Sequence, residues 1–262
     1  MGNTDKISNT IKNKHTVNPL LSVRNVTKKF DAVVALDDLS FEVEQHEILG
    51  IAGPNGAGKS TLLNVCSGML APNKGKIIFN NERVEGLPPY QMCLKGVGRT
   101  FQIPQVFGSL SVEENVSIGY TFGASGKPHL ETISPELTES ILDLTGLSSQ
   151  RDQQVGTVNL LTRKMIMLAA VLATQPLLVF MDEPLAGLNS EEIEIFASLI
   201  THLHSKLDIT FVVVEHKIRA LSSLSDRLMI IHFGGLLCLD TPDVVVKDDR
   251  VIDVYLGMEY DA

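Results

Sequence analysis

The stretch GPNGAGKST, residues 53–61, decides the fold expected for this 262-residue chain. It fits the pattern G-x-x-x-x-G-K-[ST], in which a tight loop turns successive backbone N–H groups toward one anion. Gly53, Gly56 and Gly58 permit such a loop, and the apolar run ILGIA at 48–52 supplies the buried strand before it. A helix after the loop would point its positive N-terminal end at the same anion. The stretch therefore predicts a nucleoside triphosphate site, and its flanks argue against a chance match in a surface loop.

The side chains and backbone of this loop have expected roles in binding ATP and Mg²⁺. Lys59 would reach the terminal phosphates, and the Ser60 hydroxyl is a suitable Mg²⁺ ligand beside the β- and γ-phosphate oxygens. The other positions would surround the phosphates. The predicted nucleotide-binding residues of the loop are Gly53, Pro54, Asn55, Gly56, Ala57, Gly58, Lys59, Ser60 and Thr61.

Composition narrows the functional classes. An apolar fraction of 44% is enough for a sizeable core. The chain carries 22 basic and 31 acidic residues, a net charge of −9, which argues against nucleic acid as the main partner because no basic field attracts phosphates. Its three cysteines, Cys66, Cys93 and Cys238, are too few and too far apart for a disulfide framework or a zinc site. They are expected to be reduced, as in a cytoplasmic protein.

No segment reads as a membrane anchor. Residues 1–19 are polar and predict a flexible tail, without the apolar centre of a signal peptide. The most apolar stretch runs from Met165 to Met181, but Gln175 and Pro176 interrupt it and leave it short of a bilayer span. We interpret that stretch as a buried helix, a turn and a strand.

The rest of the chain predicts an α/β fold. Alternation at Leu21, Val23 and Asn25, and then at Leu39, Phe41 and Val43, indicates two antiparallel strands that precede the loop. Later apolar runs indicate strands covered on both faces of a parallel sheet, and a helix-spaced pattern separates the first two of these runs. The runs are 177–181, 209–214 and 228–231, and the helix pattern is Ile193, Phe196, Ile200, Leu203 and Leu207.

Residues 96–164 break the strand–helix rhythm. Turn residues recur there, a Gly-Lys-Pro stretch occupies 126–128, and Ser134 with Pro135 favours a helix start. We predict an inserted, mostly helical subdomain. Residues 20–262 then form one domain, whose nucleotide-binding core is built from 20–95 and 165–257.

Polar residues follow the predicted parallel strands, at the edge where ligands bind in open sheets. Asp182 and Glu183 follow one strand, and Glu215 and His216 follow another. Asp182 suits the Mg²⁺ shell, and Glu183 is the predicted catalytic base that polarises the attacking water. His216 would hydrogen-bond the γ-phosphate, and Gln102 would contact both metal and water. Taken singly, each residue also has a structural interpretation: a strand that ends in acids, a satisfied histidine, a loop glutamine.

Together these motifs resemble the ATP-binding subunits of ABC transporters. The likeness covers nearly all of residues 20–257. The matching segments are, in order, Phe30, GPNGAGKST, Gln102, MDEP at 181–184, AGLN at 186–189 and His216. The segments GRTFQ at 98–102, LSVEENV at 110–116 and YLG at 255–257 most resemble the branched-chain amino acid importers, with urea importers and lipopolysaccharide exporters as close neighbours.

The resemblance implies a P-loop NTPase (RecA-like) core and a peripheral subunit on the cytoplasmic face of the cell membrane. Such subunits dimerise head to tail around two ATP molecules and drive membrane-spanning permease subunits. A solute-binding protein delivers the solute to the permease. Phe30 would stack on adenine. Gln102 would link the ATP site to the surface that receives the permease, and Asn189 would lie in a loop that communicates across the dimer.

One segment departs from the family pattern. The family has a signature resembling LSGGQ about twenty residues before the acidic motif, and it contacts the γ-phosphate held by the opposite subunit. Here that place reads NLLTRKM, 159–165, with an apparent deletion of about two residues, and no glycine lies between Thr157 and Ala186. Losing one preorganised donor costs about 3 kcal/mol of transition-state stabilisation. Thr162 and Arg163 offer a hydroxyl and a charge but no freed backbone N–H groups.

Two functional interpretations remain open at this point. In the first, the chain is the ATPase subunit of an importer, in an asymmetric heterodimer whose partner supplies an intact signature to Lys59. In the second, it is a catalytically weak nucleotide-binding subunit that stabilises a complex without powering it. A smaller departure is His46, where the family usually has glycine before the strand.

Overall fold

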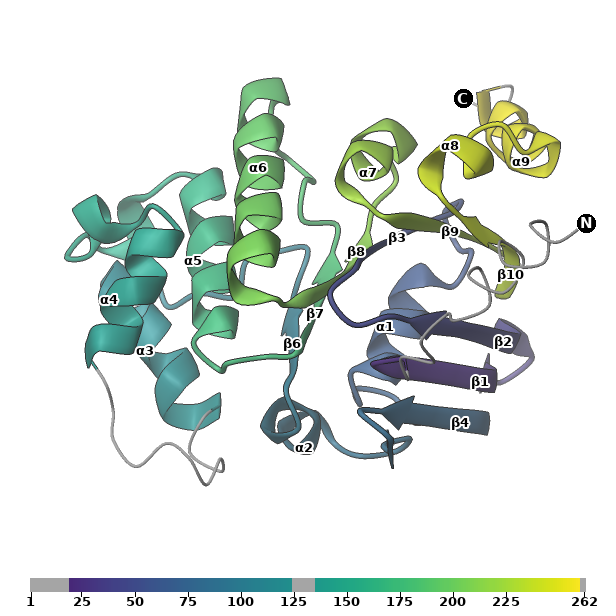
Figure 1. The fold of residues 1–262 in the computed structure, drawn as a ribbon, viewed down its shortest axis with the longest axis horizontal. Coiled ribbons are helices and arrows are strands. Elements are labelled where there is room, and N and C mark those ends of the chain that lie inside the picture. The colour runs from purple at the N-terminus through teal and green to yellow at the C-terminus, as the bar shows by residue number, and fades with distance from the viewer. Residues whose placement is uncertain (1–18, 124–134, 260–262) are drawn as a thin grey trace, which may run out of the picture.

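The computed structural model describes residues 19–123 and 135–259 (Figure 1). Apart from Pro19, the predicted flexible tail lies outside the described residues. The same is true of the Gly-Lys-Pro stretch at 126–128 and of Ser134. Within the described residues, no helix combines the length and the apolar character needed to cross a membrane.

A six-stranded, mainly parallel sheet forms the centre of the molecule, in the order β10-β9-β3-β8-β7-β6. Only β10 is antiparallel to its neighbour. The strands β3, β7 and β8 are buried along their whole length, which is why their sequences are mostly apolar. The parallel sheet predicted from the three later apolar runs is confirmed. The strands are β3 (Ile48–Ala52), β6 (Val97–Thr100), β7 (Leu178–Asp182), β8 (Thr210–Val214), β9 (Arg227–His232) and β10 (Gly235–Asp240).

A second, antiparallel sheet lies beside the first, in the order β2-β1-β4-β5. It contains β1 (Leu21–Phe30), β2 (Val33–Val43), β4 (Lys74–Phe79) and β5 (Glu82–Arg83). The predicted alternation fails at Asn25. Its φ of 50° accompanies a register shift between Val23 and Val26, so Asn25 is exposed and Val26 takes the next buried position.

Helices cover both faces of the central sheet (Figure 1). One helix, α1, packs between the two sheets, where Leu62 and Leu63 join a cluster with residues of β3 and of the antiparallel strands. The helices α5, α6 and α7 contribute to the cluster on the opposite face. The helices are α1 (Lys59–Cys66), α2 (Pro89–Leu94), α3 (Val112–Gly123), α4 (Pro135–Leu144), α5 (Leu160–Leu172), α6 (Ser190–Leu207), α7 (Ile218–Leu224), α8 (Pro242–Val245) and α9 (Asp249–Glu259), with short 3₁₀ turns at Ser148–Gln150 and Val155–Thr157.

The segment predicted as a helical insertion is mostly helical, but its boundaries differ from the prediction. Strand β6 lies inside 96–164 and yet pairs with β7 in the central sheet, and α5 begins at Leu160 rather than after 164. The strand was missed because VGRT is short and contains a glycine, which reads as a turn. Gly98 is small for a packing reason: a Cβ there would lie 2.5 Å from a Val171 side-chain carbon of α5.

His46 occupies the turn before β3 with a left-handed φ of 58°. That conformation favours glycine, which accounts for the glycine usual at this place in the family pattern. Here the turn is held by two contacts: the His46 N–H donates to Thr210 Oγ1 at 2.9 Å, and His46 Nδ1 lies 2.6 Å from the Asp208 carbonyl oxygen. The substitution therefore alters the turn locally and leaves β3 in register.

Candidate nucleotide-binding site

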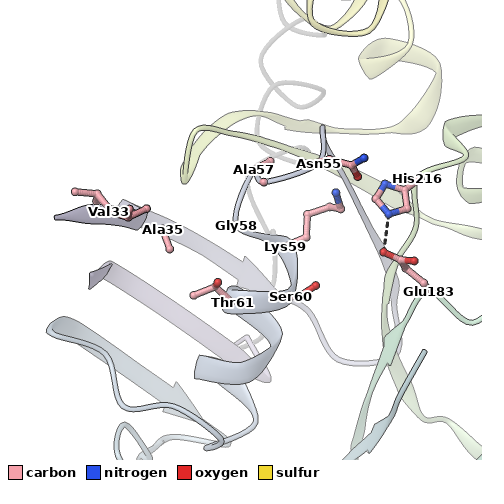
Figure 2. A pocket seen from close by; sticks show the side chains of 12 residues that line it. Val33, Ala35, Asn55, Ala57, Gly58, Lys59, Ser60, Thr61, Glu183 and His216 are labelled. Atoms are coloured by element: carbon pink, nitrogen blue, oxygen red, sulfur yellow. Dashed lines mark hydrogen bonds and ion pairs between the residues drawn. The ribbon is translucent and has the colours of Figure 1, made fainter. Parts of the chain in front are cut away.

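A cavity of about 260 Å³ opens at the carboxyl edge of the central sheet (Figure 2). The strands β3, β8 and β7 are neighbours in the sheet, so the segments that follow them converge on one place, as the sequence predicted. The antiparallel sheet closes the other side through the start of β2. The lining consists of Val33, Val34, Ala35, Asn55, Gly56, Ala57, Gly58, Lys59, Ser60, Thr61, Glu183 and His216.

The loop between β3 and α1 has the tight form that its glycines predicted. Gly58 has a φ of 106° and immediately precedes α1, and a Cβ there would lie 2.4 Å from the Ala35 carbonyl oxygen. At Gly53 a Cβ would lie 2.2 Å from the Ile231 carbonyl oxygen. Any side chain at these positions would push the loop away from β2 and β9. The loop therefore keeps the N-terminus of α1 open toward the cavity, which is the geometry that binds phosphates.

Lys59 is buried at the first position of α1, with 5% of its surface exposed. Its Nζ donates to the carbonyl oxygens of Gly53 at 2.7 Å and Pro54 at 2.9 Å. Burial lowers the pKa of Lys59, and the negative charges of Glu183 and Asp182 oppose that shift. Figure 2 shows this side chain extending toward the side of the cavity where Glu183 and His216 lie. The lysine and the acids predicted to act together are thus in electrostatic contact.

Three predicted residues from three segments meet at the carboxylate of Glu183. Gln102 Nε2 donates to Glu183 Oε2 at 2.6 Å, and His216 Nε2 lies 2.5 Å from Glu183 Oε1. The backbone at Glu183 is left-handed, with a φ of 46°, and its N–H donates to the Val214 carbonyl oxygen at 2.9 Å. This conformation turns the side chain away from the sheet and into the cavity lining. A carboxylate held this way can accept a proton from a water beside the terminal phosphate.

Asp182 lies behind Glu183 and is ion-paired with a residue that the sequence analysis did not select. Arg99 NH2 lies 3.1 Å from Asp182 Oδ2, and Arg99 NH1 donates to Asn64 Oδ1 at 2.7 Å and Ser67 Oγ at 2.8 Å on α1. Burial raises the pKa of Asp182, and the charge of Arg99 opposes that shift. Arg99 lies within the GRTFQ segment quoted in the sequence analysis, but β6 itself was not predicted, so nothing marked this arginine as buried.

Oxygen donors suited to Mg²⁺ surround the same place. The Ser60 hydroxyl lines the cavity, and the Asp182 carboxylate ends the neighbouring strand. Mg²⁺ usually takes one or two protein ligands and completes its shell with phosphate oxygens and water, so this donor set fits the ion. Across the described residues, no group of three or more His, Cys, Asp or Glu side chains forms an all-protein metal site. The place of Gln102 in the metal shell stays a prediction.

The predicted adenine-stacking residue lies at the margin of the site. Phe30 ends β1, is 44% exposed and does not line the cavity, while Lys28 Nζ lies 5.2 Å from its ring centroid. Val33 and Val34, just beyond the hairpin turn, line the cavity instead. Stacking of Phe30 on adenine stays a prediction.

The segment 159–165, which the sequence analysis predicted to depart from the family signature, forms the capped start of α5. The Asn159 side chain caps α5 by accepting from the Thr162 N–H at 2.8 Å, and Thr162 itself is buried. Arg163 turns back onto its own chain, where it donates to the Gly156 and Val158 carbonyl oxygens at 3.0 and 3.2 Å. Of the two groups noted in the sequence, the Arg163 charge is therefore engaged within the chain, and the Thr162 residue that carries the hydroxyl is buried.

Two further buried ionisable residues lie behind the site: Lys164, which the sequence analysis did not select, and Glu215, which it noted at a strand end without giving it a role. Lys164 is 1% exposed and its Nζ lies 3.4 Å from the carbonyl oxygens of both Gln102 and Glu183. Glu215 is 3% exposed and accepts from the Leu185 N–H at 2.7 Å. Burial lowers the pKa of Lys164 and raises that of Glu215. A charged residue in the middle of an otherwise apolar helix was the available signal for Lys164.

Comparison with known proteins agrees with this geometry. The family model described as ABC transporter matches residues 36–186. The chain belongs to the ABC transporter family. Members hydrolyse ATP, and their ATP-binding subunits pair with permease subunits and dimerise, so the predictions of an ATPase and of these two partner types are confirmed at the level of the family.

Similar proteins include the high-affinity branched-chain amino acid transport ATP-binding proteins BraF of Pseudomonas aeruginosa and LivG of Escherichia coli. Each is 30% identical over 250 residues, which cover 91% of this chain and 98% of the relative. The lipopolysaccharide export ATP-binding protein LptB of Haemophilus influenzae is 27% identical, covering 92% and 98%. A structure of the ADP conformation of MJ1267, an ATP-binding cassette of an ABC transporter, matches with a TM-score of 0.81 at 28% identity, covering 91% of this chain and 99% of that one. The predicted fold class is confirmed.

Proposed function

We propose that this chain is the ATP-hydrolysing subunit of an importer for branched-chain amino acids or similar small polar solutes. The observation that carries the proposal is the Glu183 carboxylate, held between Gln102 and His216 at the cavity that contains Lys59. The substrate class rests on the two relatives that are 30% identical to the chain along most of its length. Urea import and lipopolysaccharide export are the alternative transport roles.

Each residue of the site has a separate proposed role in ATP hydrolysis. The loop 53–61 and Lys59 hold the triphosphate, and Ser60 with Asp182 would hold Mg²⁺, which neutralises phosphate oxygens when bound. Glu183 orients the attacking water and takes its proton, while Gln102 and His216 fix the direction of the carboxylate. His216 also lines the cavity, where its ring can donate to the γ-phosphate.

The permease would dock beside Gln102. A mostly apolar cleft of about 220 Å³ lies there, between the end of α1, α2, β6 and α5. Met69, Cys93 and Phe101 are among its lining residues, and Tyr90 and Ile103 are exposed apolar side chains in the adjoining segments. A membrane subunit seated in this cleft would contact the segment that leads into Gln102 and so bear on Glu183. Docked in this way, the chain would be a peripheral subunit at the cytoplasmic face of the membrane.

The closed N-terminus of α5 supports an asymmetric heterodimer. A helix N-terminus binds a phosphate through free N–H groups, and here Asn159 takes one of them while Leu160 presents an apolar side chain at the first helical position. Such an end is a poor donor to an ATP held by a second subunit. The competent site would join Lys59 and Glu183 of this chain to an intact signature from a partner subunit. The same closure favours the alternative, a catalytically weak nucleotide-binding subunit.

ATP turnover by the full transporter complex distinguishes the two functions. The chain is assayed alone and assembled with its partner ATP-binding subunit and permease, as wild type and as Glu183→Gln. If the chain is the ATP-hydrolysing subunit, ATP turnover appears on assembly and falls at least about a hundredfold in the Glu183→Gln variant, because the attacking water then has no base to take its proton. Glu194→Gln, an exposed carboxylate on α6, serves as the matched control and should leave the rate unchanged. If the assembled complex turns over ATP equally fast with Glu183→Gln, the chain is instead the catalytically weak nucleotide-binding subunit.

A further inference from the structure

A lysine buried on α5 carries an inference about how the site is held together. Lys164 is among the largest fully buried side chains of the described residues. Its Nζ makes two long hydrogen bonds to carbonyl oxygens, and none of the described carboxylates lies within ion-pair distance of it. Burying this ammonium group is costly, since its desolvation is only partly offset by the two carbonyl dipoles and by the charges of Glu215 and Glu183 beyond ion-pair distance. A residue retained at such a cost needs a role beyond packing.

The two carbonyl groups that Lys164 contacts belong to the two residues whose side chains meet in the site. One is Gln102, which follows β6, and the other is Glu183, which follows β7. Their side chains are hydrogen-bonded to each other at 2.6 Å. Lys164 therefore closes a ring: its ammonium group joins the backbones of Gln102 and Glu183 on one side, and their own side chains join on the other. The ring fixes the separation of the two loops.

The Glu183 backbone needs such a support. A non-glycine residue with a φ of 46° costs about 1 kcal/mol or more relative to the right-handed regions, so the turn tends to relax unless its groups are held. The Glu183 carbonyl oxygen accepts from the Ala186 N–H at 3.2 Å and from Lys164, and the next turn N–H, of Leu185, is held by the buried carboxylate of Glu215. Two buried ionisable residues, Lys164 of α5 and Glu215 just after β8, thus each form a hydrogen bond with this turn.

We propose that Lys164 is a positioning residue for ATP hydrolysis, which holds Gln102 and Glu183 in register through their carbonyl groups and makes their alignment depend on the position of α5. The inference rests on the proposed role of Glu183. Because α5 begins at Leu160, directly after its N-cap Asn159 and at the place of the family signature, Lys164 connects that helix end to the water-activating carboxylate. Movement of α5 against the central sheet would misalign the site without touching the nucleotide loop.

The test compares Lys164→Met with wild type in the assembled complex and in the isolated full chain. Methionine keeps the length and the burial but removes the charge and the donors. We expect kcat to fall roughly tenfold to a hundredfold, as for a small misplacement of a catalytic group, while the KM for Mg-ATP changes less than about twofold. In the isolated chain, amide hydrogen exchange in residues 183–188 should become several-fold faster, and the Tm should be unchanged or higher because a buried charge is gone.

Companion variants separate positioning from packing. Lys164→Arg should restore most of the activity, and Lys164→Gln, which keeps a neutral donor, should fall between arginine and methionine. Met167→Leu on the same helix is the packing control and should leave kcat unchanged. In a Glu183→Gln background, Lys164→Met should add no further loss, because it acts through Glu183.

Each opposite result overturns the inference. Unchanged kcat and unchanged exchange in a folded Lys164→Met protein would show that the lysine supports nothing. A kcat loss that tracks a lowered Tm, or that Met167→Leu reproduces, would make Lys164 a packing residue. If instead Glu183→Gln alone leaves ATP turnover intact, the proposed function fails, and this outcome is distinct from a silent Lys164→Met in a complex that still depends on Glu183.

Discussion

At the scale of single residues, backbone strain and buried charged side chains are concentrated around the Glu183 carboxylate. Glu183 adopts a left-handed backbone, Lys59 and Lys164 are buried, and Asp182 is paired with Arg99. None of these features improves stability, since each adds a conformational or desolvation cost. Together they hold a cluster of side chains in fixed positions before any substrate arrives. Preorganisation of this kind is what charge development in a phosphoryl-transfer transition state requires.

The thiol of Cys66 provides a residue-scale prediction about pH. This side chain ends α1, is fully buried, and burial raises its pKa from 9.0 to about 12. At pH 8 the folded protein should therefore alkylate at Cys66 at least ~1000-fold more slowly than the unfolded chain, since only the thiolate reacts. The raised pKa also means that this thiol's contribution to stability is complete below pH 9.0 and is lost as the pH rises toward about 12.

Iodoacetamide labelling followed by mass spectrometry checks the prediction, in a Cys93→Ser, Cys238→Ser variant that leaves one thiol. Labelling in denaturant gives the reference rate. Native and denatured rates within about tenfold of one another would show that α1 opens readily, contrary to the burial seen here.

At the scale of elements, the helix end that departs from the family pattern is capped by ordinary means. Asn159 is a favourable N-cap, and its bond to the Thr162 N–H is the same device that Asn189 uses on α6, where Glu192 completes a capping box. The N-terminus of α5 is therefore capped rather than frayed, with the Thr162 N–H held by the Asn159 side chain.

Asn159→Ala tests that capping bond. Loss of an N-cap costs about 1 kcal/mol, which for a domain of this size lowers the Tm by roughly 2–4 °C in thermal unfolding. Asn189→Ala is the matched control and should lower the Tm at least as much, because it also breaks the capping box. An unchanged Tm in Asn159→Ala beside a clear drop in Asn189→Ala would indicate that the α5 end is not closed by this side chain.

Sequence reasoning was strongest where a pattern and a chemical group coincided. The loop 53–61, the strand before it and the acids after β7 were all predicted, because an apolar run followed by phosphate-binding or acidic residues marks the end of a buried parallel strand. Strand β6 and the boundary of the helical segment were missed, since four residues with a glycine carry no usable period. Arg99 and Lys164 were missed because their partners lie 83 and 19 or more residues away along the chain, and sequence spacing does not encode such tertiary contacts.

At the scale of the whole molecule, the nucleotide cavity and the N-terminus of α5 differ in how well each is suited to bind a phosphate. The cavity face keeps Lys59, Glu183 and His216 together, while at the start of α5 the Thr162 N–H is taken by the Asn159 side chain. A homodimer of such chains would contain two sites that both lack a helix N-terminus for the γ-phosphate. The proposed heterodimer contains one site with every donor present. On this proposal the asymmetry arises from the chain itself, so association behaviour should reveal it without any transport assay.

The isolated chain should remain a monomer of 28.6 kDa when Mg-ATP is added to the Glu183→Gln variant, because ATP held by one copy finds no open helix N-terminus on the other to join the two subunits. Addition of the partner ATP-binding subunit should give a 1:1 dimer that persists only with nucleotide. Sedimentation velocity with and without Mg-ATP measures both states, and wild type without the substitution controls for turnover during the run. ATP-induced association of the isolated variant at micromolar concentration, at twice the monomer mass, would mean that the capped α5 end still accepts a phosphate and that asymmetry is not required. Absence of any ATP-dependent dimer with the partner would remove the heterodimer from the proposal while leaving the site of this chain as described.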